Sequence, residues 1–344
     1  MRTLFRSSAA VLSAVALTTI AACGGTGGGA ASSDTVTVYS ADGLGDWYAK
    51  EFKDFTARTG VKVSYVEGGS GEVVSRIQKE QSNPQADVLV TLPPFIQQAD
   101  ADGALAPSGA DVSAITPELA DPSGKYVAVV NNYFAMIRHN GLDPKPDAWT
   151  DLTSAAYKQK IQYSTPGQAG DGTAMLLLVQ HVLGDQQGLD YLKALQANNV
   201  GPSSSTGKLG PKVSKGELSV ANSDLQMALA SIAKDKSAYQ VFYPTHDGKR
   251  TTLALPYYMG LTAKAPHSAN GRKLIEFLLS KEVQQTVPSG AWGAPVRTDV
   301  APSGPETTAF TTALAGVDIW YPDWNAIRGG IDALVKSYNT ATGQ

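Results

Sequence analysis

Short segments of alternating apolar and polar residues recur along the chain, and each is followed by a helical pattern. Residues 35–40 alternate as a strand does, and aromatic residues at helical spacing then continue up to Gly60. Residues 61–66 and 87–91 predict two further strands, and the segment between them predicts a helix that stops at Asn83-Pro84. Strand and helix in alternation predict a parallel sheet with crossover helices.

The rest of the chain predicts further α/β units. We expect one or two strands within 125–138, a helix over 173–184, a strand over 218–221 with a helix after it to Ala233, a strand over 253–261, a helix over 270–286 and a C-terminal helix over about 323–338. With 344 residues, of which 42% are hydrophobic and 17% charged, the chain is globular and too long for one core. We expect two lobes, 34–130 plus 253–300 and 131–252 plus 301–344.

The first 33 residues differ from the rest. Arg2 and Arg6 precede a run of small and apolar residues that ends at Cys23, so residues 1–22 predict a secretory signal. The context of Cys23 resembles a bacterial lipobox, which implies a lipidated cysteine and an anchor on the outer face of the cytoplasmic membrane. Residues 23–33, rich in Gly and Ser, then predict a flexible tether. Cys23 is the only cysteine, so the exported chain has no disulfide.

The charge of the chain excludes one class of partner. Loss of Arg2 and Arg6 with the signal would take the formal net charge from −3 to −5, which does not favour nucleic acid. We also expect no cofactor and a monomer.

Three loops predict a ligand site. Residues 68–71, 164–173 and 222–224 each join the end of a predicted strand to the start of a helix, and they are rich in small and hydroxylated residues. In open α/β sheets ligands bind at this edge, where helix N-termini offer unpaired N–H groups to an anion. The same residues are also common as simple helix caps.

Several segments carry a resemblance to a known family. From Val36 onward, the chain resembles the 2-aminoethylphosphonate-binding components of ABC importers, which belong to the wider class of ferric-type periplasmic binding proteins. The segments that carry the resemblance are 36–43, 65–69, 83–91, 162–174, 196–202, 205–208, 292–293 and 295–297. The resemblance implies a two-lobed α/β fold of the type II periplasmic binding proteins, in which a ligand closes between the lobes. It also implies delivery to a membrane permease driven by a separate ATPase subunit, and no catalysis.

The two charged groups of 2-aminoethylphosphonate need different contacts, and we choose candidate residues for each. A phosphonate group needs hydroxyls and backbone N–H groups, for which we choose Ser70, Thr91, Ser164, Thr165, Gly172 and Thr173. An ammonium group needs a carboxylate and an aromatic face, for which we choose Asp42, Asp224, Tyr258 and Trp47. Asp171 lies among the anion-binding positions, so we expect it to brace its own loop.

Two other functions compete with this interpretation. Tyr257-Tyr258 could suggest ferric ion, but adjacent residues of a strand face opposite sides, so only one can reach a cleft. Two Ser-x-x-Lys patterns, at 205–208 and 231–234, could suggest a penicillin-binding enzyme, but the accompanying motifs of that class are missing. The four histidines show no zinc spacing, and 201–208 departs from a P-loop. We therefore expect no enzyme and no metal.

Overall fold

The structure is a computed structural model that describes residues 34–344. The predicted signal 1–22, Cys23 and the tether 23–33 lie outside the described residues. Within 34–344, none of the helices combines the length and the apolar character that a bilayer span needs.

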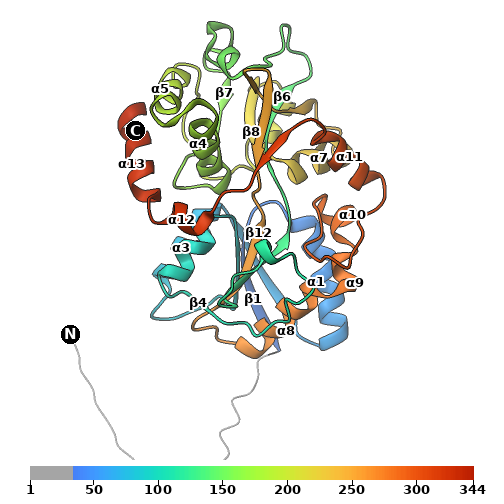
Figure 1. Ribbon diagram of the computed structural model, residues 1–344. Coiled ribbons are helices and arrows are strands. Elements are labelled where there is room, and N and C mark those ends of the chain that lie inside the picture. The colour runs from blue at the N-terminus through green and yellow to red at the C-terminus, as the bar shows by residue number, and fades with distance from the viewer. Residues whose placement is uncertain (1–33) are drawn as a thin grey trace, which may run out of the picture. The chain divides into compact units, whose positions relative to one another are not determined.

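Lobe one is built on a six-stranded sheet in the order β2-β1-β3-β12-β4, with β5 paired to β12 (Figure 1, lower half). The first three strands run parallel, whereas β12 is antiparallel to β3, β4 and β5. The strands are β1 (Thr35–Ala41), β2 (Lys62–Gly68), β3 (Val88–Thr91), β4 (Leu105–Ala106), β5 (Tyr126–Val130) and β12 (Tyr257–Thr262). The helices of this lobe are α1 (Gly45–Thr59), α2 (Ser70–Lys79), α3 (Phe95–Ala101), α8 (Ser268–Leu279), α9 (Lys281–Gln284) and α10 (Val287–Ala291), with the 3-10 turn η1 (Pro117–Leu119).

Helix α1 follows the predicted pattern closely. Tyr48, Phe52 and Phe55 are buried on one face, and Tyr48 stacks on Phe52 with ring centroids 4.6 Å apart. Gly60 ends the helix with a φ of +74°, and its N–H donates to the carbonyl of Thr56. A glycine adopts this left-handed conformation without the strain that a side chain would add.

Lobe two is built on a four-stranded sheet in the order β7-β8-β6-β9 (Figure 1, upper half). β6 is antiparallel to β8 and β9, and β7 is parallel to β8. The elements are β6 (Phe134–His139), η2 (Trp149–Thr153), η3 (Ala155–Tyr157), β7 (Ile161–Gln162), α4 (Gly170–Leu183), α5 (Asp185–Leu195), α6 (Gly210–Ser214), β8 (Val220–Asp224), α7 (Leu225–Lys234) and β9 (Tyr239–Phe242).

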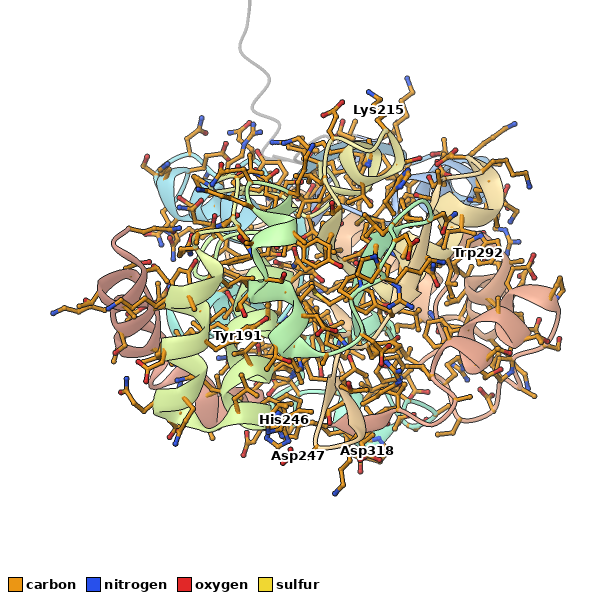
Figure 2. The ribbon with its side chains drawn as sticks, turned by 90° about the horizontal axis from the view of Figure 1, so that it is seen from above. Tyr191, Lys215, His246, Asp247, Trp292 and Asp318 are labelled. Atoms are coloured by element: carbon orange, nitrogen blue, oxygen red, sulfur yellow. The ribbon has the colours of Figure 1, made fainter. Side chains whose placement is uncertain are left out.

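A small third sheet joins β10 (Thr245–His246), β11 (Lys249–Leu253) and β13 (Asp318–Trp320). His246 and Asp247, at the turn between β10 and β11, lie beside Asp318 at one edge of the molecule in Figure 2. The ring of Trp320 stacks on His181 of α4 with centroids 4.1 Å apart. This sheet therefore fixes the C-terminal part of the chain to lobe two.

Two chain segments cross between the lobes side by side. Residues 131–133 connect β5 to β6, and residues 254–256 connect β11 to β12. Tyr133 pairs with Ala254 as an antiparallel bridge, and the N–H of Leu255 donates to the carbonyl of Asn132 over 2.8 Å. Two α/β lobes joined by crossing strands confirm the predicted fold class, the type II periplasmic-binding-protein fold.

The C-terminal segment contacts both lobes. Its helices are α11 (Pro305–Ala313), α12 (Trp324–Arg328) and α13 (Ile331–Thr342). Helix α12 packs against α3 of lobe one and α13 packs against α5 of lobe two. The hydroxyl of Tyr126, on β5, also donates to Asn325 of α12 over 3.2 Å. The assignment of 34–130 plus 253–300 and of 131–252 plus 301–344 to the two lobes stays a prediction.

The structure divides three elements that the sequence predicts as continuous. The predicted strand 253–261 is broken at residues 254–256, where the chain passes between sheets and Pro256 has no N–H to donate. The predicted helix 270–286 breaks at Ser280, whose hydroxyl accepts the N–H of Val283 and so caps a new helix. The predicted C-terminal helix breaks at Gly329-Gly330, a pair of residues with poor helix propensity.

Candidate functional site

Two of the three predicted loops, 68–71 and 164–173, meet where the two lobes touch, whereas residues 222–224 are the end of strand β8 rather than a loop. The N–H of Gly71, in the first turn of α2, donates to the carbonyl of Gln168 over 3.0 Å. Gly69 lies so close to the opposite lobe that a methyl group at its Cα would be 2.1 Å from the carbonyl oxygen of Ser204. At the start of α4, the corresponding position of Gly170 is 3.0 Å from Oγ of Ser70. Backbone thus packs on backbone along this junction, because glycines stand where side chains would clash.

Asp42 connects the lobes through its carboxylate. It follows β1 and is partly buried, and its Oδ2 accepts hydrogen bonds from the hydroxyl of Ser205 over 2.5 Å and from the N–H of Gly207 over 2.8 Å. Burial raises the pKa of Asp42, whereas these two hydrogen bonds lower it. Both donors belong to lobe two, so the carboxylate of Asp42 holds the junction closed.

Asp224 uses both of its carboxylate oxygens within the protein. It is the last residue of β8 and the N-cap of α7, where Oδ1 accepts the N–H of Met227 over 2.8 Å. Its Oδ2 accepts the hydroxyl of Tyr257, the first residue of β12, over 2.7 Å. Burial raises the pKa of Asp224 in spite of these two bonds.

Asp171 lies in the first turn of α4 and is 3% exposed. Burial, and then the charge of Asp224, raise its pKa well above the ordinary value, while the hydroxyl of Thr206 lowers it. Within residues 34–344, Oδ1 of Asp171 is a buried atom with no hydrogen-bond partner. Oδ1 of Asp171 therefore does not brace the loop, and the expected bracing role of the carboxylate as a whole stays a prediction.

Tyr257 rather than Tyr258 faces this junction. The hydroxyl of Tyr257 lies 2.8 Å from the carbonyl oxygen of Asp42 and 3.3 Å from Nε2 of Gln226, in addition to its bond to Asp224. Tyr258 points to the other face of the sheet and packs edge-on against Tyr126, with centroids 5.5 Å apart. The two tyrosines thus face opposite sides, as adjacent strand residues should.

Most of the hydroxyls chosen from the sequence form hydrogen bonds inside the loops. Oγ of Ser164 accepts from the hydroxyl of Thr206 over 3.0 Å and from Nδ2 of Asn222 over 2.9 Å. Oγ1 of Thr173 accepts the N–H of Gly167, and Oγ1 of Thr165 accepts the N–H of Ser203, each over 3.0 Å.

The remaining three anion candidates, Ser70, Thr91 and Gly172, lie near the same point. The hydroxyl of Thr91 donates to the carbonyl of Ser70 over 3.1 Å, so the end of β3 supports the start of α2. Gly172 packs on the backbone of Ser164, where a methyl group would be 2.2 Å from the carbonyl oxygen. The structure therefore brings Ser70, Thr91, Ser164 and Gly172 to one region at the starts of α2 and α4.

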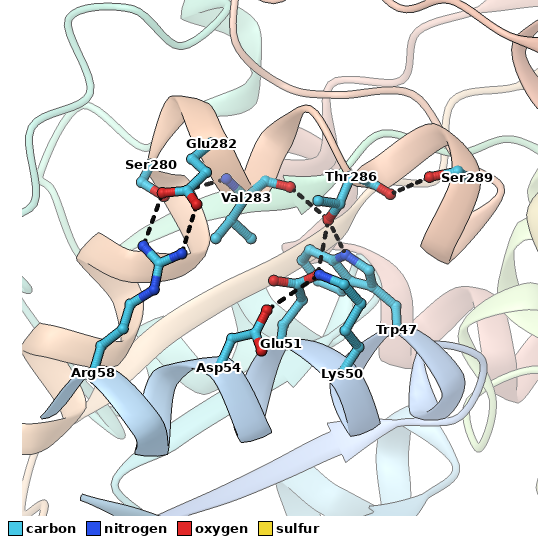
Figure 3. Close-up of polar contacts among 10 residues, drawn as sticks. All are labelled: Trp47, Lys50, Glu51, Asp54, Arg58, Ser280, Glu282, Val283, Thr286 and Ser289. Atoms are coloured by element: carbon cyan, nitrogen blue, oxygen red, sulfur yellow. Dashed lines mark hydrogen bonds and ion pairs between the residues drawn. The ribbon is translucent and has the colours of Figure 1, made fainter. Parts of the chain in front are cut away.

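Trp47 lies elsewhere, within lobe one. Its indole N–H donates to the hydroxyl of Thr286 over 2.9 Å, and the same hydroxyl donates to Oε1 of Glu51 over 3.0 Å (Figure 3). The ring is 1% exposed and packs against Gly290 of α10. The structure thus places Trp47 between α1 and α10 rather than beside the three aspartates.

Sequence reasoning missed four contributors to the junction, namely Ser205, Thr206, Gly207 and Tyr257. The run of small hydroxylated residues at 203–207 resembles the three loops described above, and this signal could have selected it. Periodicity alone cannot tell which of two adjacent tyrosines faces the ligand side. No group of three or more His, Cys, Asp or Glu side chains within 34–344 is arranged to hold a metal ion, so the three aspartates do not form such a site.

Comparison with known proteins agrees with this geometry. The family of bacterial extracellular solute-binding proteins matches residues 41–285. The chain is 48% identical over 318 residues to a protein of Salmonella typhimurium named "Putative 2-aminoethylphosphonate-binding periplasmic protein", covering 90% of this chain and 93% of that protein. The predicted resemblance is confirmed.

Solved structures show the same fold at low identity. The periplasmic binding protein P5PA superposes with a TM-score of 0.78 at 20% identity, covering 90% of this chain and 99% of that one. The ferric binding protein from Campylobacter jejuni superposes with a TM-score of 0.72 at 20% identity, covering 89% and 99%. The chain belongs to the bacterial extracellular solute-binding proteins, the binding components of ABC importers.

Proposed function

We propose that this solute-binding protein captures 2-aminoethylphosphonate between its two lobes and delivers it to the permease of an ABC importer. The 48% identical relative supports this choice of ligand, because its name specifies that compound. The relatives compared above are solute-binding proteins rather than enzymes, so we assign no catalytic step.

One observation carries the proposal: three aspartates lie together beside two helix N-termini, and in the part of the chain that the structure describes no cationic side chain pairs with them. No Lys, Arg or His within 34–344 forms an ion pair with Asp42, Asp171 or Asp224. Buried carboxylates of like charge raise each other's pKa and gain from a cation placed among them. The ammonium group of the ligand would supply this charge, with Asp42 and Asp224 as the candidates chosen from the sequence.

The phosphonate group would lie at the starts of α2 and α4. Helix N-termini attract anions through unpaired N–H groups and the helix dipole. The hydroxyls of Ser70, Thr91, Ser164, Thr165 and Thr173, with the backbone at Gly172, are the proposed contacts. Trp47 and Tyr258, the aromatic residues chosen from the sequence, lie away from this junction, so we propose Tyr257 for the aromatic wall.

A thermal-shift series tests this function directly. 2-Aminoethylphosphonate should raise the melting temperature strongly, whereas inorganic phosphate should raise it little, because phosphate leaves the carboxylates unbalanced at a cost of about 1–3 kcal/mol. Ferric citrate is the third compound in the series, and it tests whether the protein binds iron instead. Equal shifts with phosphate, or a shift with iron alone, would reject 2-aminoethylphosphonate as the ligand.

We also propose that Cys23 is lipidated and anchors a monomer on the outer face of the cytoplasmic membrane. The small residues before Cys23 and the Gly-rich segment after it support this. A mass spectrum of the mature protein should show a diacylated N-terminal cysteine, and an unmodified thiol there would reject the anchor.

A further inference from the structure

We infer that Asp171 is the residue that binds the ammonium group and so determines the selectivity for an aminated phosphonate. This inference rests on the proposed function and changes the choice of carboxylate within it. The argument compares how the three aspartates at the junction use their oxygen atoms.

Asp42 and Asp224 already have strong partners. Oδ2 of Asp42 accepts two hydrogen bonds from lobe two, at 2.5 and 2.8 Å. Oδ1 of Asp224 caps α7 and Oδ2 accepts the hydroxyl of Tyr257, at 2.8 and 2.7 Å. A ligand that took over either carboxylate would weaken a contact between the lobes or a helix cap. Both residues are therefore better described as positioning residues of the closed state.

Asp171 has the opposite character. It is 3% exposed, and its Oδ1 is the only carboxylate oxygen within 34–344 that is buried and without a hydrogen-bond partner. A buried acceptor without a donor is costly, so a ligand group that supplies the missing donor gains binding free energy there. An ammonium group carries three donors and a positive charge. It would therefore supply both the hydrogen-bond donor that Oδ1 lacks and a cation for the carboxylate.

The position of Asp171 fits the length of the ligand. It stands at the N-terminal turn of α4, next to Gly170, whose Cα approaches Ser70 at the start of α2. The phosphonate and ammonium groups of 2-aminoethylphosphonate are separated by only two carbon atoms. Asp171 directly precedes Gly172 and Thr173, two of the proposed anion contacts, so a molecule whose charged groups are two carbon atoms apart can place its phosphonate at the start of α4 and its ammonium group at this carboxylate.

The groups that face Asp171 are acidic or neutral. Asp224 of β8 and Asp42 after β1 raise its pKa, and the hydroxyl of Thr206 lowers it. The phenol of Tyr257 on β12 stays neutral, because burial and the nearby carboxylates raise its pKa. The charge of Glu67, on β2, raises the pKa of Asp42. With only like charges and neutral groups around it, Asp171 gains more from a bound cation than from any neighbour in the protein.

Calorimetric titration with two matched probes tests this inference. Ethylphosphonate lacks the amine of 2-aminoethylphosphonate but keeps its phosphonate, so the ratio of the two dissociation constants measures amine recognition alone. Asp171→Asn should weaken binding of 2-aminoethylphosphonate by roughly 30-fold or more and leave ethylphosphonate nearly unchanged. Asp42→Asn, the control, should weaken both probes by a similar factor, because it loosens closure rather than amine binding.

Each other result overturns the inference. If Asp171→Asn keeps the wild-type ratio, or if Asp42→Asn alone abolishes it, Asp171 is not the amine ligand. Should Asp171→Asn fail to fold, a measurement on the wild type keeps the inference testable: the preference for the aminated probe should grow with rising pH as Asp171 loses its proton, and a constant preference refutes the assignment. Wild-type protein that binds ethylphosphonate as well as 2-aminoethylphosphonate rejects the inference alone, whereas wild-type protein that binds neither probe rejects the proposed function.

Discussion

The hydroxyl of Tyr257 lies 2.7 Å from Oδ2 of Asp224 and so connects the six-stranded sheet of lobe one to the four-stranded sheet of lobe two. The same hydroxyl lies 2.8 Å from the carbonyl oxygen of Asp42. One phenol thus touches two of the three aspartates at the junction. It belongs to the closed arrangement of the lobes as much as to the ligand site.

Tyr257→Phe should therefore lower both stability and affinity. The change leaves Oδ2 of Asp224 buried without its donor, which costs about 1–3 kcal/mol. Urea unfolding should show this loss, and calorimetry should show weaker binding of 2-aminoethylphosphonate. Tyr191→Phe is a matched control, because the Tyr191 hydroxyl donates to the carbonyl of Trp149, which also belongs to lobe two. It should lower stability without changing affinity, and equal affinity losses in the two variants would contradict the role of Tyr257.

Closure of the lobes should depend on the absence of a side chain at Gly69. Its φ of −67° suits alanine, but the added methyl group would lie 2.1 Å from the carbonyl oxygen of Ser204 in the other lobe. Gly69→Ala should therefore raise the dissociation constant by about 100-fold, which corresponds to roughly 2.7 kcal/mol. It should also prevent the decrease in radius of gyration that we expect on ligand binding, as measured by X-ray scattering.

Gly329→Ala controls for the loss of a glycine as such. Its φ is −61°, and the nearest atom to an added methyl group is 3.7 Å away, so this variant should bind and close like the wild type. Normal closure of Gly69→Ala would show that the junction tolerates a wider gap than the structure has.

The unliganded protein should lose stability as the pH rises through the acidic and neutral range. Burial raises the pKa of Asp171 in the folded protein, so the folded state holds a proton that the unfolded chain releases. The stabilisation is complete below the unfolded-state pKa and disappears as the pH passes the raised folded-state value. Asp171→Asn should match the wild type in acid and exceed its free energy of unfolding once the pH rises through the raised folded-state pKa of Asp171.

Asp299 offers a control of opposite sign. Arg297 lowers its pKa to about 2, so its contribution is present above the unfolded-state pKa and is lost in acid. Asp299→Asn should thus lower stability slightly at neutral pH and not near pH 2. A wild-type profile that Asp171→Asn leaves unchanged would contradict the raised pKa.

The contacts between α1 and the helices α9 and α10 should differ in strength. Thr286 accepts the indole N–H of Trp47 and donates to Glu51, which is 2% exposed, whereas the pair Arg58 and Glu282 lies on the surface (Figure 3). Thr286→Ala should cost about 1–3 kcal/mol in urea unfolding, and Arg58→Ala should cost much less, because solvent screens a surface ion pair. The reverse order would show that the buried hydroxyl contributes little.

The sequence predicts the larger part of the fold, because its patterns are local. The strand and helix around Tyr39 and Phe55, and the cap of α7 by Asp224, follow from spacing and capping chemistry that a few neighbouring residues specify. The breaks at Ser280 and Gly329 are harder to predict, because the apolar spacing continues across them. Where one helix ends and the next begins depends there on packing between distant parts of the chain.

The candidate site could be predicted only in outline. Helix starts with small residues are visible in a sequence, and so are the aspartates. Which carboxylate oxygen stays without a partner depends on residues far apart in the chain, such as Ser205 against Asp42 and Tyr257 against Asp224. Those pairings arise when the lobes meet, so no local pattern encodes them.

The C-terminal helices α12 and α13 rest on different lobes and meet at Gly329-Gly330. If the lobes separate to admit a solute, each helix should move with the lobe it contacts, and the backbone at Gly329-Gly330 should act as the hinge between them. Ligand binding should therefore change the distance between α13 and α3. A fluorescent donor on α13 and an acceptor on α3 would report this change as a change in energy transfer, so the labelled protein would be an optical sensor for its ligand.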